Sequence, residues 1–305
     1  MKKLLAFLFI FGWLFIQTAY SGGSSNSGNN SSSQTSSADR LGSAQSRANE
    51  AMTGMGMAFA EADSEPTLQD LYFLGRAVAA NILTIYKPYN GNAELTRYLN
   101  LICQAIVINN PTIELFNGSF VVILDSPELN ALASPGGHIF ITKGLVEAAA
   151  SEDMLAATIA HELAHIKLKH GMKMIEDMRF YDNMTAIMNR AYEFSGRNTS
   201  GAQSLMDFRA SVATMVDTMV RSGYSYSQEF EADQEALSLL AATGYDPGAL
   251  REMLNTLQRT QSSGSMGIFA THPSPAERIR NIERWLIYYR VQDSRRYRTA
   301  RFFNN

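Results

Sequence analysis

The spacing of apolar residues predicts two helices in the first structured part of the chain. After Pro66, apolar side chains recur three or four positions apart, at Leu68, Leu71, Tyr72, Leu74, Val78 and Ile82. This period places them on one face of a helix. Residues 93–108 repeat the pattern, with Cys103 among the apolar positions. We therefore expect two amphipathic helices, and a buried, inert thiol in the second.

Two later apolar runs are typical of strands. Residues 120–125 and 139–142 are short and rich in Phe, Val and Ile, and they are joined through residues 129–133 and a Pro-Gly-Gly turn at 135–137. They predict a small antiparallel sheet. Together with the predicted helices, this sheet indicates an α+β fold that is mainly helical. His138 follows the turn, and we expect it to be a surface or turn residue rather than a metal ligand.

The next predicted helix has a clear start. Ser151 offers an N-cap oxygen, and Glu152 and Asp153 place two acids near the positive end of the helix dipole. Apolar residues then recur at helical spacing, at Leu155, Ile159, Leu163 and Ile166. This stripe predicts a buried face, with His161 and His165 together on an adjacent face.

The segment that follows is rich in methionine and permits two interpretations. Met206, Met215 and Met219 fall at helical spacing with other apolar residues, which favours ordinary core packing. Alternatively, the methionines between Met172 and Met188 form an adaptable apolar lid that accepts unfolded segments.

The amino terminus predicts export to the periplasm or cell envelope. Lys2 and Lys3 precede an apolar run over residues 4–16, and small residues at 19 and 21 suit a signal-peptide cleavage site. The apolar run is short for a membrane span, which needs roughly 20 residues. If the leader is not cleaved, it would anchor the protein in the membrane. Peripheral association with the membrane is the alternative.

Composition divides the rest of the chain into segments. Residues 21–37 are almost wholly Ser, Gly and Asn, which is typical of a flexible tether. Removal of the leader alone leaves about 280 residues, enough for one large catalytic domain. The predicted organisation is a signal peptide at 1–21, a linker and N-terminal extension at 22–64, a catalytic domain at 65–290 and a C-terminal tail at 291–305.

Charge and cysteine content exclude several classes of protein. The formal net charge is −3, and it becomes −5 if Lys2 and Lys3 leave with the leader, so we expect no nucleic-acid partner. A single cysteine excludes an internal disulfide and a cysteine-based zinc cluster.

Residues 161–170 carry the candidate chemistry. On a helix, His161 and His165 are one turn apart and can ligate one zinc ion, while Glu162 faces a bound water as general base. His170 lacks this spacing, and we expect it to be solvated. Zinc then needs one more protein ligand.

A second helix supplies acids for that role. It is expected to begin at Ser227 and to end at Gly244. Glu229 and Asp233 share one of its faces, which suits one carboxylate ligand and one carboxylate that fixes an imidazole. Glu231 points elsewhere. The structural alternative is an acidic, solvated helix face.

Together these strings resemble the CAAX-prenyl-protease and HtpX-type zinc metallopeptidases, peptidase family M48, whose pattern is His-Glu-x-x-His followed by Glu-x-x-x-Asp. The glycine-rich turn and strand at 135–145 and the His-Pro element at 272–278 are similar to further elements of that family. The resemblance covers residues 67–286. It implies a zincin-type, gluzincin-like domain that binds one zinc ion.

The resemblance also assigns roles to individual residues. It makes His161, His165 and Glu229 the zinc ligands, Glu162 the catalytic base and Asp233 a supporting residue. His272 and Arg278 become candidate donors to the oxyanion of the tetrahedral intermediate. His272 has two other interpretations, a rigid turn before the last helix and a loop that covers the zinc.

The implied function is hydrolysis of unfolded or misassembled cell-envelope proteins by a soluble, exported bacterial metalloendopeptidase. An edge strand of the sheet could pair with an extended substrate. The alternative is a metal-binding chaperone or assembly factor of the same fold that cleaves rarely.

Overall fold

A computed structural model of the protein describes residues 67–177, 212–214, 216–220, 223–262, 273–289, 298–299 and 302. All of them lie in one of the chain's two compact units, residues 44–305. The predicted signal peptide and linker, His272, and the methionines from 178 to 211 and at 215 lie outside the described residues, as does most of the predicted tail.

The first two predicted helices are confirmed. Helix α3 spans Leu68–Ile85 and begins with a capping box, in which Thr67 and Asp70 satisfy each other's backbone N–H groups. Helix α4 spans Ala93–Asn109, with Asn92 as its N-cap. Cys103 of α4 is fully buried, and burial raises its pKa to about 11, as suits an inert thiol.

The sheet has three strands, β1 (Phe120–Leu124), β2 (Ala131–Ser134) and β3 (His138–Thr142), in the order β1-β3-β2. Strand β3 pairs antiparallel with β2 but parallel with β1, so the sheet is mixed, and the prediction of a wholly antiparallel sheet was wrong. The tight turn at Gly136, where φ is 77°, makes β2 and β3 the hairpin. Strand β2 was missed because its sequence, Ala-Leu-Ala-Ser, lacks β-branched and aromatic residues.

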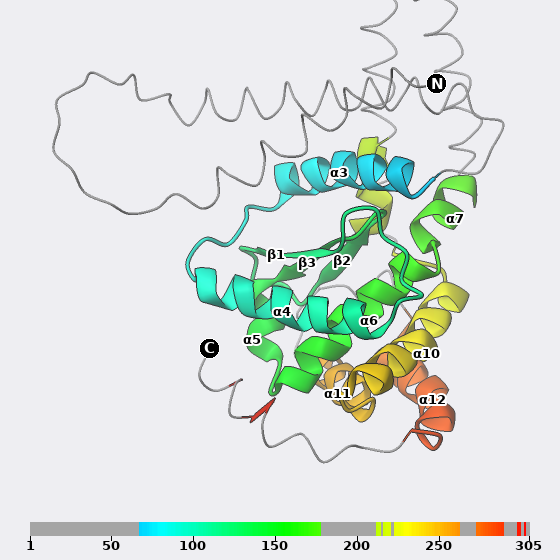
Figure 1. Ribbon diagram of the computed structural model, residues 1–305. Helices are drawn as coiled ribbons and strands as arrows, with labels where there is room; N and C mark the ends of the chain where they lie inside the picture. Colours follow the sequence, from blue (N-terminus) through cyan, green and yellow to red (C-terminus); the bar gives the residue numbers. More distant parts are fainter. Residues whose placement is uncertain are drawn as a thin grey trace, which may run out of the picture. The chain divides into compact units, whose positions relative to one another are not determined.

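Helices cover both faces of the sheet (Figure 1). Helix α3 lies along one face, where Phe140 of β3 joins a core that includes Val78 and Leu74. Ile139 and Ile141 point to the opposite face and join the larger core with α4 and the next long helix, α6. The alternation of β3 side chains thus divides the hydrophobic interior into two cores.

The helices after the sheet form the larger part of the fold (Figure 1). Among them are α5 (Lys143–Ala148), α6 (Glu152–Lys167), α7 (His170–Asp177), α10 (Tyr226–Thr243), α11 (Gly248–Ser262) and α12 (Pro275–Leu286). Ser151 caps α6 as predicted, whereas the N-cap of α10 is Ser225 rather than Ser227. Gly244 ends α10 in the left-handed conformation, as predicted. The mainly helical α+β fold class is therefore confirmed.

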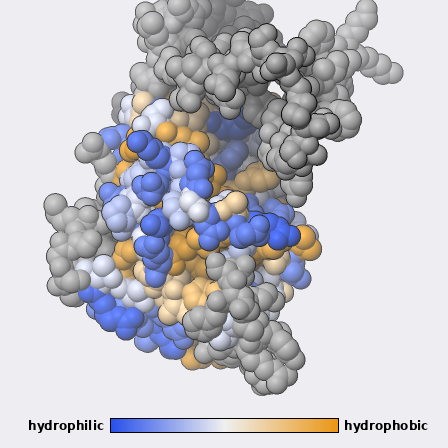
Figure 2. Space-filling model, turned by 90° about the vertical axis from the view of Figure 1, so that its left-hand side faces the viewer, coloured by the Kyte–Doolittle hydropathy of each residue, from blue (hydrophilic) through white to orange (hydrophobic). Residues whose placement is uncertain are grey.

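The described surface carries both hydrophobic and hydrophilic side chains. On the face shown in Figure 2, hydrophobic patches lie between hydrophilic side chains. Large apolar side chains exposed on the described surface include Leu101, Ile108 and Ile287. Within the described part of the chain, none of the helices combines the length and the apolar character needed to cross a membrane.

Candidate metal centre

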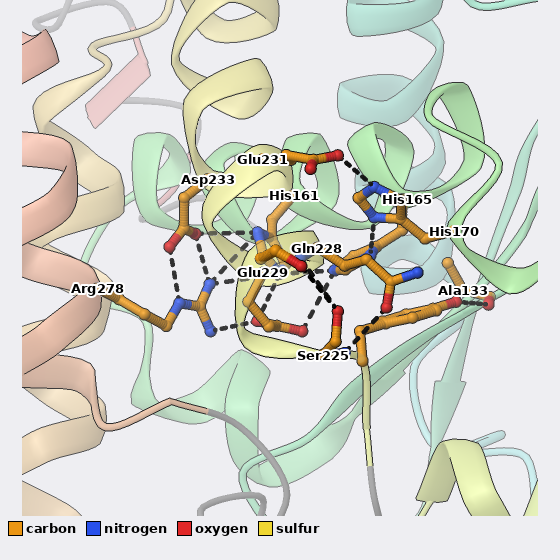
Figure 3. A network of polar contacts seen from close by, with 12 residues as sticks. Ala133, His161, His165, His170, Ser225, Gln228, Glu229, Glu231, Asp233 and Arg278 are labelled. Atoms are coloured by element: carbon orange, nitrogen blue, oxygen red, sulfur yellow. Dashed lines mark hydrogen bonds and ion pairs between the residues drawn. The ribbon is translucent and has the colours of Figure 1, made fainter. Parts of the chain in front are cut away.

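Helices α6 and α10 bring together two imidazoles and one carboxylate (Figure 3). His161 and His165 lie one turn apart on α6, and Glu229 lies in the first turn of α10. All three are buried, and one ligand atom from each lies within 4.8 Å of the other two. The packing of two capped helices thus gathers the three residues that were predicted as ligands, and this group could hold a metal ion.

The distances within this group fit a tetrahedral ion. The two Nε2 atoms are 3.1 Å apart; that of His161 lies 3.5 Å from Oε2 of Glu229, and that of His165 lies 3.5 Å from its other oxygen, Oε1. Tetrahedral zinc with bonds of about 2.0–2.2 Å separates neighbouring ligand atoms by roughly 3.3 Å. A small rearrangement of the side chains would therefore suffice to accommodate zinc.

Asp233 and Arg278 fix this arrangement from one side (Figure 3). Nδ1 of His161 lies 3.1 Å from Asp233, whose two oxygens accept hydrogen bonds of 2.8 and 2.6 Å from Arg278. Arg278 also lies 3.1 Å from Glu229 through Nη1. A carboxylate that accepts from Nδ1–H leaves the Nε2 lone pair of the imidazole available to a metal.

Arg278 offsets part of the buried negative charge in this cluster. Burial would lower the pKa of Arg278, but the charges of Asp233 and Glu229 outweigh that effect and raise it. Burial would likewise raise the pKa of Asp233, and the nearby guanidinium lowers it instead. Arg278 and Asp233 are therefore both ionised. The guanidinium that was considered as an oxyanion donor is bound to two carboxylates in this structure.

His165 has a different outer partner. Its Nδ1 lies 2.9 Å from Nδ1 of His170, whose Nε2 lies 3.3 Å from Glu231. His170 has no exposed area, so the expectation that it is solvated was wrong. The reason is Lys169, whose φ of 55° turns the chain at the end of α6 and directs His170 back onto the helix. Glu231 points away from the three candidate ligands, as expected, yet it contacts His170.

Glu162 faces a hollow beside the candidate ligands. It is buried, and it lines this hollow with His165, Tyr224 and residues 131–133 of β2. Tyr224 stacks on His165, with ring centroids 4.0 Å apart, and its hydroxyl donates to the carbonyl of Ala133 at 3.5 Å. Tyr224 could not be predicted as a site residue, because it lies outside the motifs and before the helix that carries Glu229.

A larger cleft adjoins this hollow along β2. Its lining includes Ala133, Ser134 and Pro135 of the sheet edge, together with His165 and Tyr224. His138 is the first residue of β3, is partly buried and is not part of the metal group. The cleft leads from the sheet edge to the candidate ligands.

Comparison with known proteins identifies relatives of this chain. The sequence model of peptidase family M48 matches residues 92–286, a span that contains the whole cluster. The mitochondrial metalloendopeptidase OMA1 of Schizosaccharomyces pombe is 28% identical over 166 residues, which cover 54% of this chain and 45% of that protein. The beta-barrel assembly-enhancing protease of Escherichia coli (strain K12) is 26% identical over 199 residues, 63% of this chain and 39% of the relative.

A shorter relative is covered more fully. Metalloprotease LoiP of Escherichia coli (strain K12) is 25% identical over 193 residues, which cover 63% of this chain and 70% of that protein. The chain spans less than half the length of OMA1 and of the beta-barrel assembly-enhancing protease.

Proposed function

The chain belongs to peptidase family M48, a family of metallopeptidases, and on this premise we propose that it is a zinc-dependent metalloendopeptidase that hydrolyses unfolded or misassembled proteins of the cell envelope. The observation that carries the proposal is the buried group of His161, His165 and Glu229, with Glu162 beside it. Two imidazoles and one carboxylate are a donor set of catalytic zinc sites, which keep a fourth position open.

Zinc would be held by these three residues and would supply Lewis-acid chemistry, by lowering the pKa of water towards about 7 and polarising the scissile carbonyl. Glu162 takes the proton from the attacking water and returns it to the leaving amine. Its place in the hollow, next to His165, suits both transfers. Asp233 holds the His161 ring with Nε2 directed at the metal position.

Arg278 supports the site, and another residue donates the hydrogen bond to the oxyanion. Its guanidinium holds Glu229 and Asp233 in place and offsets one of their two charges. We keep His272, which precedes Pro273 and lies outside the described residues, as one candidate donor to the oxyanion. Tyr224 is a second candidate, because its phenol lines the hollow with Glu162 and could exchange its long, 3.5 Å hydrogen bond to the Ala133 carbonyl for one to the oxyanion.

The substrate class follows from the sheet edge. Strand β2 is an edge strand, and the cleft along it reaches His165. A peptide that adds to such an edge is recognised mainly through its backbone, which favours extended, unfolded segments of little sequence selectivity. One similar protein is named for enhancing β-barrel assembly. With the leader-like amino terminus, this supports action on proteins of the periplasm or cell envelope.

Cleavage of casein by the purified protein tests the proposal, with zinc content measured in parallel for the wild type and for Glu162→Gln. We expect both proteins to hold one zinc ion, and kcat of the variant to fall by about 10²–10⁴-fold, the usual contribution of a general base. Equal cleavage by the two proteins would exclude Glu162 as the base. Zinc binding without cleavage by either protein would favour the chaperone alternative.

A further inference from the structure

A chain of hydrogen bonds leads away from His165 on the side opposite its candidate metal position. Its members are His165, His170 and Glu231, and the links are 2.9 Å between the two Nδ1 atoms and 3.3 Å from Nε2 of His170 to the carboxylate (Figure 3). The two imidazoles are almost fully buried, whereas the Glu231 side chain is 53% exposed. The chain of contacts thus runs from the buried centre to the surface.

The direction of these hydrogen bonds is fixed at both ends. A neutral imidazole carries one N–H donor and one acceptor nitrogen. If Nε2 of His165 offers its lone pair to a metal, its proton is on Nδ1, which donates to Nδ1 of His170. His170 then carries its proton on Nε2, which faces Glu231. An ionised carboxylate only accepts, so the surface end of the chain requires the same direction as the metal end.

The backbone conformation that places His170 is an unfavourable one. In a continuous helix, a residue five positions after His165 would be rotated by roughly 140° away from it. The left-handed conformation of Lys169, with φ 55°, interrupts the helix and brings the ring back. That conformation costs free energy for any residue with a side chain, and it is typical of sites where the surrounding structure requires it.

We propose that His170, supported by Glu231, is the positioning residue of His165, and so the counterpart of Asp233 at His161. The inference rests on the proposed metal site and extends it. Both candidate ligand rings then have their tautomer and orientation set by an outer acceptor, one by a buried carboxylate and the other through a second imidazole. His170 itself touches neither the metal position nor the substrate.

The test is the zinc dissociation constant, measured by chelator competition. His170→Leu removes the acceptor of His165 and should weaken zinc binding about 10–100-fold. His170→Asn places an amide oxygen near the position of Nδ1 and should restore affinity to within a few-fold. With cobalt in place of zinc, the visible absorption spectrum of H170L should shift, and that of H170N should match the wild type.

Glu231→Ala gives a further readout that a merely structural role would not produce. Because Glu231 acts through His170, the substitution should weaken zinc binding in the wild type but have no further effect in H170L. Glu235→Ala is the matched control. It breaks the 2.6 Å ion pair between Lys167 of α6 and Glu235 of α10, which lies outside the chain of contacts, and should leave zinc affinity unchanged.

The outcomes separate this inference from the proposed function. Zinc binding and a cobalt spectrum in H170L equal to those of the wild type would overturn the role of His170 and leave the metal site intact. Failure of the wild type to bind zinc would overturn both. If H170L does not fold, as judged by circular dichroism in chelator, H170N and Glu231→Ala carry the test, and equal losses for Glu231→Ala and Glu235→Ala would reject the inference.

Discussion

Replacing Arg278 by methionine should destabilise the metal-free protein more than the zinc-loaded protein. The guanidinium makes contacts of 2.6, 2.8 and 3.1 Å with Asp233 and Glu229, and neither carboxylate has any exposed area. Methionine keeps much of the apolar volume but removes the charge. Removing one partner of a buried ion pair costs about 3–5 kcal/mol, because the remaining charge stays buried.

Bound zinc should reduce the stability that Arg278→Met costs. The ion compensates the charge of Glu229, so only the hydrogen bonds of Arg278 to Asp233 are then lost, and the free energy of unfolding should fall by about 1–3 kcal/mol. The assay is urea unfolding followed by circular dichroism, in chelator and in zinc. In chelator, the larger loss corresponds to a decrease in Tm of roughly 6–20 °C for a domain of this size.

A matched control lies at the other end of α6. Arg298 is a second buried arginine, and it donates to Asp153 at 2.9 Å, far along the helix from the ligands. Arg298→Met should also destabilise the fold, but by the same amount with and without zinc. A loss below 1 kcal/mol for Arg278→Met in chelator, or a loss that zinc does not reduce, would refute the reasoning.

Three further substitutions test other parts of the structure. Asp233→Asn removes the anionic acceptor of His161 and should weaken zinc affinity about 10–100-fold in a chelator competition, while an unchanged affinity would exclude its role. Burial, with the nearby charge of Arg76, lowers the pKa of His138 to about 4 from 6.5, so its contribution to stability is complete above pH 6.5 and is lost as the pH falls towards 4. His138→Phe lacks this titration, so between pH 7 and pH 4 its free energy of unfolding should rise relative to that of the wild type by up to about 3 kcal/mol. The same dependence of unfolding free energy on pH in both proteins would contradict this. Gly136→Ala should destabilise the fold by about 2 kcal/mol or more in urea unfolding, because φ is 77° there and a Cβ would lie 2.4 Å from Cα of Tyr72.

The helices that carry the candidate ligands were predictable because local rules determine them. The Ser151 cap, the apolar stripe of α6 and the glycine stop of α10 are all readable from the sequence. The spacing of His161 and His165 then follows from the helical period. The packing of α10 on α6 decides that Glu229 rather than Asp233 faces the two Nε2 atoms. Spacing alone did not distinguish the two acids, and the choice of Glu229 as ligand came from the family resemblance.

Other features depend on tertiary structure and could not be predicted. The burial of His170 results from one left-handed residue at a helix end, a conformation for which lysine gives no signal. The parallel pairing of β1 with β3 depends on a third strand made of small residues. Arg278 lies 45 residues after Asp233 in the sequence, and its contacts depend on how α12 docks against α10.

The docking of α12 also has a consequence for biosynthesis. Glu229 follows His161 by 68 positions, and Arg278 follows it by 117. A nascent chain that carries both imidazoles still lacks the carboxylate ligand and the arginine that pairs with Glu229 and Asp233. The complete centre, with Arg278 in place, can therefore form only after α12 has been made, which is late in synthesis or translocation of residues 1–305.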